Sequence, residues 1–329
     1  MSRSSEIALS IKDLQTHFPT PRGLVKAVDG VSLEVREGEC VGLVGESGSG
    51  KSITGFSVLG LLEPPGRVAG GSVRYKGKEL VGASVDELRS IRGNRIAMIF
   101  QDPMMTLNPV LSIGTQMVET VTAHARVSKT EALARSRDAL ARVGISSPEE
   151  RLAAYPHQFS GGMRQRVAIA IALLHNPDVI IADEPTTALD VTIQAQIIAE
   201  IQKLCSESRT ALIWISHDLA TVAGIADRIA VMYAGQIVEE GSVDDIIGRP
   251  RHHYTRGLIG SVPSNNRRGE RLRQIPGSTS SPLNRPPGCT FRPRCERAKE
   301  SCAADPAMTF EGLHGYRCFF PHSSGGHHV

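Results

Sequence analysis

A glycine-rich segment has the residue types and spacing of a phosphate site. Residues 45–52, Gly-Glu-Ser-Gly-Ser-Gly-Lys-Ser, match the pattern G-x-x-x-x-G-K-[ST] and follow the apolar run 40–44. Glycines let the backbone curl so that successive N–H groups face a phosphate. Lys51 can then reach the β- and γ-phosphate oxygens, and Ser52 can ligate Mg²⁺. The predicted nucleotide site comprises Gly45, Glu46, Ser47, Gly48, Ser49, Gly50, Lys51 and Ser52.

An acidic pair follows a second apolar run. Asp183 and Glu184 end the segment Val-Ile-Ile-Ala-Asp-Glu, which is typical of a buried strand. Open α/β sheets bind ligands at the carboxyl ends of their strands. We expect Asp183 to hold Mg²⁺ through water and Glu184 to orient and deprotonate the attacking water. Taken alone the pair fits a solvated loop, but its combination with the phosphate segment favours catalysis.

Two more polar residues also follow apolar runs that are typical of buried strands. His217 closely follows the apolar run 211–215, and Gln101 follows the run 96–100. A lone histidine is usually structural, but the end of a buried strand favours a contact between His217 and the γ-phosphate. The neutral amide of Gln101 can contact both the metal and the attacking water.

Ser160, Gly161 and Gly162 open an amphipathic segment that extends to residue 174. A serine and free backbone N–H groups at a helix N-terminus form an anion site, although an ordinary N-cap is the alternative. If one ATP were bound between the phosphate segment of one subunit and the Ser160 helix of another, binding would drive dimerisation and hydrolysis would release it.

The elements that must position these residues alternate in type. Apolar patterns predict strands at 7–11, 31–35, 40–44, 72–75, 96–100, 179–182, 211–215 and 229–233. Residues 104–172 are predicted to be mostly helical, with capping-box spacing from Ser128 to Glu131. The pattern indicates an α/β sheet with an inserted helical subdomain.

Length and composition bound the class of protein. The chain has 329 residues, of which 40% are hydrophobic and 22% charged, so it can bury a core and about two domains are expected. No apolar run has the ~18 residues of a membrane span, and the N-terminus lacks the apolar region of a secretory signal. These features exclude a membrane-embedded protein, a small secreted module and a fibrous repeat, and predict a cytosolic chain.

The positive charge is concentrated near the C-terminus. Residues 249–297 contain eleven Arg, no Lys and two acids, whereas the net charge of the whole chain is +3. Residues 261–293 are rich in Pro, Ser, Asn and Gly, which predicts a boundary between a folded body and a basic tail. Aromatic residues are scarce there, so single-stranded nucleic acid is disfavoured. A solvated tail, or one that contacts anionic lipid, is the prediction.

The motifs together resemble those of an ABC-type ATPase, over nearly the whole chain. The matching segments are the Walker A loop 45–52, the Q-loop Gln101, the signature 160–164, Walker B ending at Asp183 and Glu184, the D-loop 188–190 and the switch His217. The commonest signature has Gln where this chain has Met163. The resemblance implies a P-loop, RecA-like α/β core with an antiparallel β subdomain, a helical subdomain at about 104–172 and a cysteine-bearing C-terminal extension. It also places Phe18 where family members stack an aromatic ring on adenine.

Within that family the chain resembles the ATPases of oligopeptide/dipeptide importers. The segments 101–109, 155–166 and 253–258 carry this likeness, together with the four-cysteine extension. Met163 resembles the first of the two ATPases of such importers. The resemblance implies an ATPase domain at 6–248 and an extension at 249–329, in a subunit that drives di-/oligopeptide import by ATP-driven dimer closure.

The same resemblance implies partners and a location. The partners are a second ATPase in a heterodimer, two membrane permeases and an extracytoplasmic peptide-binding protein, with no nucleic acid. Ser160 then serves the partner's nucleotide, and the chain lies peripherally on the cytoplasmic face of the inner membrane. The alternatives are import of nickel, glutathione or another small solute, an ABC ATPase of DNA repair or translation, and a non-hydrolysing ATP switch. Glu184 and His217 disfavour the switch.

Four cysteines mark the C-terminal extension. Cys289, Cys295, Cys302 and Cys318 have no Cys-x-x-Cys pair, which weakens a structural zinc site. Thiolates among arginines suit an iron–sulfur cluster, and the resemblance implies a [4Fe-4S] cluster at these four positions. Zinc and free thiols remain the alternatives.

Overall fold

The computed structural model describes residues 6–187, 190–262, 274–280 and 282–322. The chain divides into two compact units. The first unit contains the segments Met1–Leu9, Val35–Glu39 and Gly82–Ile213, and the second contains Ser10–Glu34, Cys40–Val81 and Trp214–Val329. Each unit carries part of the predicted nucleotide site.

A four-stranded sheet in the order β2-β1-β4-β5 lies mainly in the second unit. Its strands are β1 (Ile7–Thr20), β2 (Gly23–Arg36), β4 (Arg67–Tyr75) and β5 (Lys78–Glu79). Val31, Leu33 and Val35 of β2 are buried and alternate with exposed polar residues, so one face of the strand packs on the core. This is the antiparallel subdomain that the family resemblance implies, with β1 and β2 longer than their apolar patterns.

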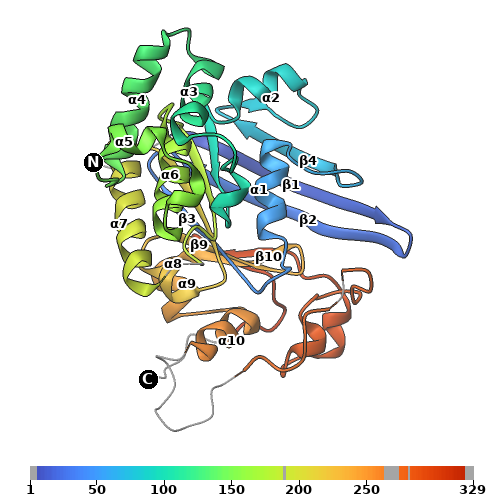
Figure 1. The fold of residues 1–329 in the computed structure, drawn as a ribbon. Coiled ribbons are helices and arrows are strands. Elements are labelled where there is room, and N and C mark those ends of the chain that lie inside the picture. The colour runs from blue at the N-terminus through green and yellow to red at the C-terminus, as the bar shows by residue number, and fades with distance from the viewer. Residues whose placement is uncertain (1–5, 188–189, 263–273, 281, 323–329) are drawn as a thin grey trace. The chain divides into compact units, whose positions relative to one another are not determined.

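The second unit also carries the strand that precedes the phosphate segment. β3 (Cys40–Val44) pairs in parallel with β9 (Arg228–Tyr233), so that Val41 lies opposite Arg228 and Val44 opposite Val231. β9 pairs antiparallel with β10 (Gln236–Ser242), and β10 with β12 (His314–Tyr316). β11 (Thr309–Glu311) completes this part of the sheet, so the C-terminal extension adds a hairpin to the β9–β10 edge (Figure 1).

Short helices complete the second unit. They are α1 (Lys51–Leu59), α8 (Leu219–Ala223), α9 (Val243–Gly248) and α10 (His253–Ser261), with 3-10 turns at Arg292–Arg294 and Glu300–Ala303. α1 follows β3 directly after the glycine-rich loop, as expected for a phosphate site.

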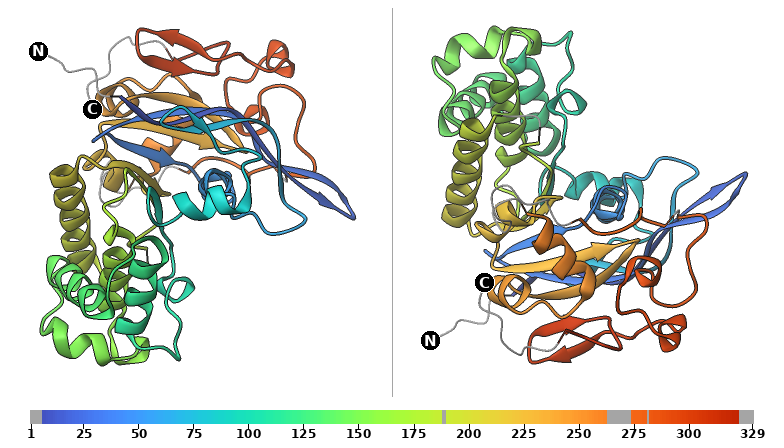
Figure 2. Two further views of the ribbon diagram at one scale, coloured as in Figure 1. Left: turned by 90° about the horizontal axis from the view of Figure 1, so that it is seen from above. Right: turned by 90° about the horizontal axis from the view of Figure 1, so that it is seen from below.

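The first unit contains a parallel strand pair and most of the helices. β6 (Ile96–Ile99) pairs with β7 (Val179–Asp183), and both are buried along their whole length. β8 (Ala211–Ser216) begins in this unit. The helices are α2 (Val85–Ile91), α3 (Ile113–His124), α4 (Lys129–Arg142), α5 (Pro148–Ala153), α6 (Gly161–Leu173) and α7 (Val191–Ser208), with 3-10 turns at Pro103–Met105 and Pro156–Gln158. Figure 2 shows α3 to α7 side by side.

Side-chain caps explain where several of these helices begin. Ser112, Ser128 and Ser160 each accept a hydrogen bond from a backbone N–H in the first turn of α3, α4 and α6. The full capping box predicted at Ser128 forms only in part, because the Glu131 side chain pairs with Arg135. A complete box occurs instead at Ser84, which opens the unpredicted helix α2.

Three arginines of the arginine-rich segment are held in ion pairs and are poorly exposed. Arg251, Arg285 and Arg294 form ion pairs with Glu311, Asp29 and Glu46, and their side chains are 12%, 18% and 4% exposed. The prediction of a solvated tail is therefore wrong for these three residues. Four further arginines of the segment lie outside the described residues.

In the described ranges, no helix has both the length and the apolar composition that a membrane crossing requires.

Candidate nucleotide site

The glycine-rich loop has a backbone that only glycine can supply. Gly48 and Gly50 have φ angles of 77° and 105°, in the left-handed region that side chains disfavour. A Cβ added at Gly45 would lie 2.1 Å from the Met232 carbonyl oxygen, and one at Gly50 would lie 2.4 Å from the Ala27 oxygen. The glycines thus allow the close, curled backbone path that a phosphate cradle needs.

Lys51 is held inside this loop. Its Nζ donates hydrogen bonds to the carbonyl oxygens of Gly45 at 2.8 Å and Glu46 at 3.0 Å, and the residue is 4% exposed. Ser52 lies in the first turn of α1, where the backbone N–H groups and the helix dipole favour an anion. A buried ammonium, a hydroxyl and a glycine cradle fit a Mg²⁺-bound nucleotide phosphate, with Ser52 as a candidate metal ligand.

Two other predicted residues lie in the second unit. His217 follows β8 and is exposed, and the next residue, Asp218, caps α8 by accepting a hydrogen bond from the Ala220 N–H at 2.9 Å. Phe18 is half-buried in β1, and its ring packs against Gly66. Their contacts to nucleotide remain predictions.

The acidic pair and Gln101 meet in the first unit. Asp183 ends the buried strand β7 and is 4% exposed, and Glu184 follows with a φ of 45°. Gln101 Nε2 donates to Glu184 Oε2 at 3.3 Å, and Thr187 Oγ1 donates to the same oxygen at 3.0 Å. The structure therefore brings together the predicted metal ligand, the predicted base and the amide.

Ser160 caps α6 in the same unit. Its Oγ accepts a hydrogen bond from the Met163 N–H at 3.3 Å, and both Ser160 and Gly161 are exposed. Gly162 lies in the first turn of this 13-residue helix. Ser160 is thus an ordinary N-cap, as the alternative interpretation predicts. The N-terminus of α6 is nevertheless exposed and accessible to an anion. Ala188 and Leu189 of the predicted D-loop lie outside the described residues.

The predicted residues therefore form two groups, one in each unit. Lys51, Ser52 and the rest of the phosphate loop belong to the second unit with Phe18 and His217. Gln101, Asp183, Glu184 and Ser160 belong to the first unit.

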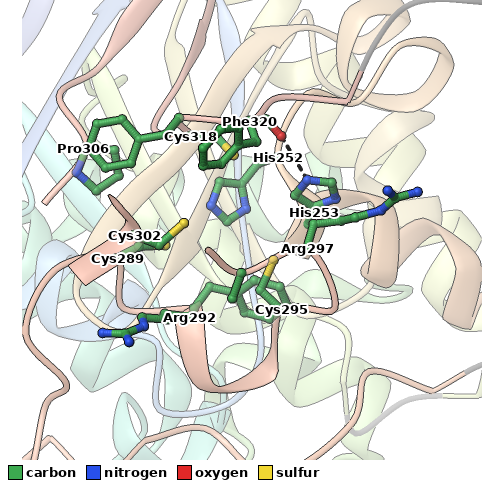
Figure 3. Close-up of a pocket in the computed structure, with 13 residues that line it drawn as sticks. His252, His253, Cys289, Arg292, Cys295, Arg297, Cys302, Pro306, Cys318 and Phe320 are labelled. Carbon is green, nitrogen blue, oxygen red and sulfur yellow. Dashed lines mark hydrogen bonds between the residues drawn. The ribbon is translucent and has the colours of Figure 1, made fainter. Parts of the chain in front are cut away.

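The prediction of an iron–sulfur cluster is wrong. Cys289, Cys295, Cys302 and Cys318 are all described and line one pocket of about 20 Å³, which has room for about one water molecule (Figure 3). Among the residues that the structure describes, no three His, Cys, Asp or Glu side chains are grouped so as to hold a metal ion. The same finding leaves a zinc site without support.

The physical reason lies in the environment of the thiols. Burial raises the pKa of Cys289 and Cys295, and it raises that of Cys318 to about 11. Burial therefore disfavours the thiolate form of these three cysteines, and the thiolate is the form that binds a metal. A backbone hydrogen bond from Cys289 to the Cys302 carbonyl shows that the segment is held by its own chain contacts. Spacing suggested four ligands, but it could not report the buried surroundings of the thiols.

Sequence reasoning missed the contacts that the extension makes with the phosphate loop. Arg294 forms a two-point ion pair with the Glu46 carboxylate, and the Tyr254 hydroxyl accepts a hydrogen bond from the Glu46 N–H at 2.8 Å. The segment 253–258 was recognised only as a family likeness, and Arg294 only as one of many arginines. A buried aromatic and one arginine among many give no signal of their own for such a contact.

A phosphate cradle after a buried strand, with an acidic pair after another, defines a P-loop ATPase. The model of the ABC transporter family matches residues 28–187, and that of the oligopeptide/dipeptide transporter C-terminal region matches residues 238–302. The chain belongs to the ABC transporter ATP-binding family and carries this C-terminal region.

Similar proteins have been named in several bacteria. The chain is 45% identical to the oligopeptide transport ATP-binding protein AppD of Bacillus subtilis, over 96% of this chain and 98% of AppD. It is 46% identical to OppD of Escherichia coli, over 93% of this chain and 90% of OppD. The dipeptide transport protein DppD of Bacillus subtilis is 48% identical over 90% of this chain and 89% of its own length.

Solved structures share the fold. A dimeric ATP-binding cassette in a post-hydrolysis state, bound to ADP and phosphate, has a TM-score of 0.64 and 29% identity, over 71% of this chain and 98% of its own. The cbiO1 protein of Clostridium perfringens, part of the cbiONQ transporter complex, has a TM-score of 0.62 and 25% identity, over 74% of this chain and 92% of its own. The predicted α/β P-loop fold is confirmed.

Proposed function

We propose that this chain is the ATP-hydrolysing subunit of an importer of di- and oligopeptides. The match of residues 238–302 to the oligopeptide/dipeptide transporter C-terminal region carries the proposal, because that region distinguishes this chain from other ABC ATPases. The names of the similar proteins AppD, OppD and DppD, which are oligopeptide and dipeptide transport ATP-binding proteins, support the same substrate class.

The phosphate loop binds the nucleotide in this proposal. Backbone N–H groups of residues 45–50 and the Lys51 ammonium contact the phosphates, and the half-buried ring of Phe18 stacks on adenine. Mg²⁺ would be held by the Ser52 hydroxyl, by Asp183 and by the Gln101 amide, and when bound it neutralises phosphate charge.

Glu184 is the base for hydrolysis in this proposal. Its Oε2 is held by Gln101 and Thr187, so the carboxylate is already oriented before the nucleotide arrives. Glu184 takes the proton from the attacking water, and His217 contacts the γ-phosphate. Gln101 donates to the base itself, so a movement of Gln101 would change the orientation of Glu184.

Two ATPase subunits act together. The exposed N-terminus of α6, with Ser160, Gly161 and Gly162, contacts the nucleotide of the partner, so ATP binding closes the pair and hydrolysis releases it. A dimeric cassette is among the solved structures with this fold, which supports the arrangement. The partner is a second, different ATPase.

The remaining partners follow from peptide import. They are two membrane permeases and an extracytoplasmic peptide-binding protein, and the chain is held against the cytoplasmic face of the inner membrane by the permeases. The domain boundary between residues 248 and 249 belongs to this proposal as well.

Reconstitution tests this function. The tagged full-length chain is purified with its native membrane assembly, its partners are identified by mass spectrometry, and the assembly is placed in liposomes with the binding protein. We expect ATP-dependent uptake of labelled di- and oligopeptides, and a second ATPase among the partners. Uptake of nickel or glutathione in place of peptides, or co-purification with DNA-repair or ribosomal proteins, would contradict the proposal.

A further inference from the structure

The second residue of the phosphate loop is bound by the C-terminal extension. Arg294 Nη1 lies 2.6 Å from Glu46 Oε2, and Nη2 lies 3.0 Å from Oε1. Thr279 Oγ1 donates a third hydrogen bond to Oε2 at 3.1 Å. A bidentate pair fixes the carboxylate in orientation as well as in position, since both of its oxygens are held.

The arginine is held in turn. Its side chain is 4% exposed, its Nε donates to the Pro276 carbonyl at 2.8 Å, and its guanidinium lies within 6 Å of the ring centres of Tyr233 and Phe291. Contacts on the guanidinium edge and near both rings leave little freedom for another rotamer. Arg294 is thus a rigid donor directed at the loop.

The Glu46 peptide is bound from a second direction. Its N–H donates to the Tyr254 hydroxyl at 2.8 Å, and Tyr254 is fully buried in α10. Its carbonyl accepts a hydrogen bond from Lys51 Nζ at 3.0 Å. The same residue therefore contacts the extension through its side chain and N–H, and the phosphate-binding lysine through its oxygen.

The charge of Glu46 links its ion pair with Arg294 to ATP binding. A carboxylate in a phosphate loop repels the nucleotide phosphates unless it is neutralised. Burial by itself would raise the pKa of Glu46, but the hydrogen bonds and charge of Arg294 outweigh it and lower that pKa, so Glu46 is ionised at neutral pH. Without Arg294, a negative charge would stand next to Lys51 with its nearest counter-charge removed.

We propose that Arg294 and Tyr254 are positioning residues for the phosphate loop, through which the C-terminal extension sets the ATP affinity of its own chain. The inference rests on the proposed role of Lys51 in ATP binding, and it assigns to the extension a second role besides any contact with partners.

The test measures the Kd of a Mg²⁺-bound, non-hydrolysable ATP analogue to full-length variants. Arg294→Gln is expected to weaken binding about tenfold, as the loss of one charge-assisted contact predicts. The double variant Glu46→Gln with Arg294→Gln removes the unpaired charge and should return the Kd to within about threefold of the unmodified chain. In the reconstituted assembly, Arg294→Gln should raise KM for ATP and leave kcat nearly unchanged.

Arg251→Gln is the matched control. Arg251 is also a poorly exposed arginine of the extension, but it pairs with Glu311 and lies over the Tyr316 ring, whereas Arg294 pairs with Glu46 of the phosphate loop. It should lower thermal stability without changing the Kd. If Arg294→Gln and Arg251→Gln lower stability alike and neither changes the Kd, the contact only attaches the extension and the inference is wrong.

Tyr254→Phe covers the case in which Arg294→Gln fails to fold. This change removes a single hydroxyl, keeps the buried ring, and leaves the Glu46 N–H without its acceptor. We expect faster amide hydrogen exchange in residues 45–52 and a Kd raised about threefold to tenfold. Unchanged exchange in that segment together with an unchanged Kd would overturn the inference.

Discussion

Gln101 donates its side-chain N–H to the Oε2 atom of Glu184 across 3.3 Å, although the two residues are 83 positions apart in the chain. Each follows a strand of the parallel β6–β7 pair, so the pairing of the strands brings their ends together. The amide and the carboxylate thus form one polar unit, in which Thr187 supplies the second donor. This arrangement supports a role for Glu184 as a base whose direction is set by its neighbours.

Glu184→Gln is expected to abolish ATP turnover and to keep ATP binding. The amide has nearly the same shape but cannot take a proton from water, so turnover should fall by about a hundredfold or more, in the range of a lost general base. Turnover in the purified assembly and the Kd for ATP are measured side by side. The exposed Glu119→Gln on α3 serves as the control, and turnover in Glu184→Gln equal to that control would remove Glu184 from its assigned role.

Lys51→Ala is expected to weaken ATP binding itself. Its ammonium is buried in the loop and, in our proposal, contacts the phosphates before any chemistry occurs. Loss of a charge-assisted contact of this kind corresponds to roughly 1.5–3 kcal/mol, so the Kd should rise between about tenfold and a hundredfold. Calorimetric titration gives this value, with the exposed Lys203→Ala on α7 as the control. Tight ATP binding by Lys51→Ala would place the phosphate site elsewhere.

The phosphate loop and the buried strands could be predicted from the sequence because local constraints determine their residue types. The loop at 45–52 needs glycine where φ is positive and where the Met232 and Ala27 carbonyls approach, so its residue types reveal it. The buried strands β3, β7 and β8 are short apolar runs and were predicted almost to the residue. Helix α2 was not predicted, because its side chains are mostly exposed and its sequence shows little hydrophobic periodicity.

Contacts between segments that are distant in the chain could not be predicted from the sequence. Glu46 and Arg294 are 248 positions apart, and nothing in either local sequence indicates that they pair. The same limit produced the error at the cysteines, because their count and spacing are properties of the chain, whereas a metal site depends on where thiols point and whether they ionise. The high density of arginine likewise suggested a solvent-exposed tail, although Arg285 and Arg294 are largely buried in ion pairs.

Acid is expected to destabilise the α10 region through His252. This histidine is fully buried and caps α10 by accepting the Tyr254 N–H at its Nδ1. Burial lowers its pKa from 6.5 to about 4, although Glu239 opposes the shift and His253 adds to it. A base with a lowered pKa in the folded state gives stability that is present above pH 6.5 and is lost as the pH falls toward 4. Its loss should reach about 2 kcal/mol at pH 5.

His252→Asn checks this origin of acid sensitivity. Asparagine can still accept the Tyr254 N–H as an N-cap, but it does not titrate. Denaturant unfolding at pH 7.5 and pH 5 gives the free energy of unfolding for both proteins, and the pH-dependent loss should be smaller by about 2 kcal/mol in His252→Asn. Equal losses in the two proteins would show that the sensitivity arises from other groups.

Ser160→Arg is expected to block closure of the ATPase pair while ATP binding to the isolated chain persists. Ser160 is exposed at the start of α6 and, in our proposal, contacts the partner's nucleotide, so the large side chain should interfere only when that nucleotide approaches. The measurement is ATP-dependent association with the partner subunit, made in the Glu184→Gln background so that ATP is not consumed.

Loss of the N-cap alone costs about 1 kcal/mol, and Ser128→Arg, at the exposed N-cap of α4, reproduces that cost away from the signature. Closure should therefore fail with Ser160→Arg and proceed with Ser128→Arg. Normal closure in both variants would mean that α6 does not contact the partner's nucleotide and that the proposed head-to-tail arrangement is wrong.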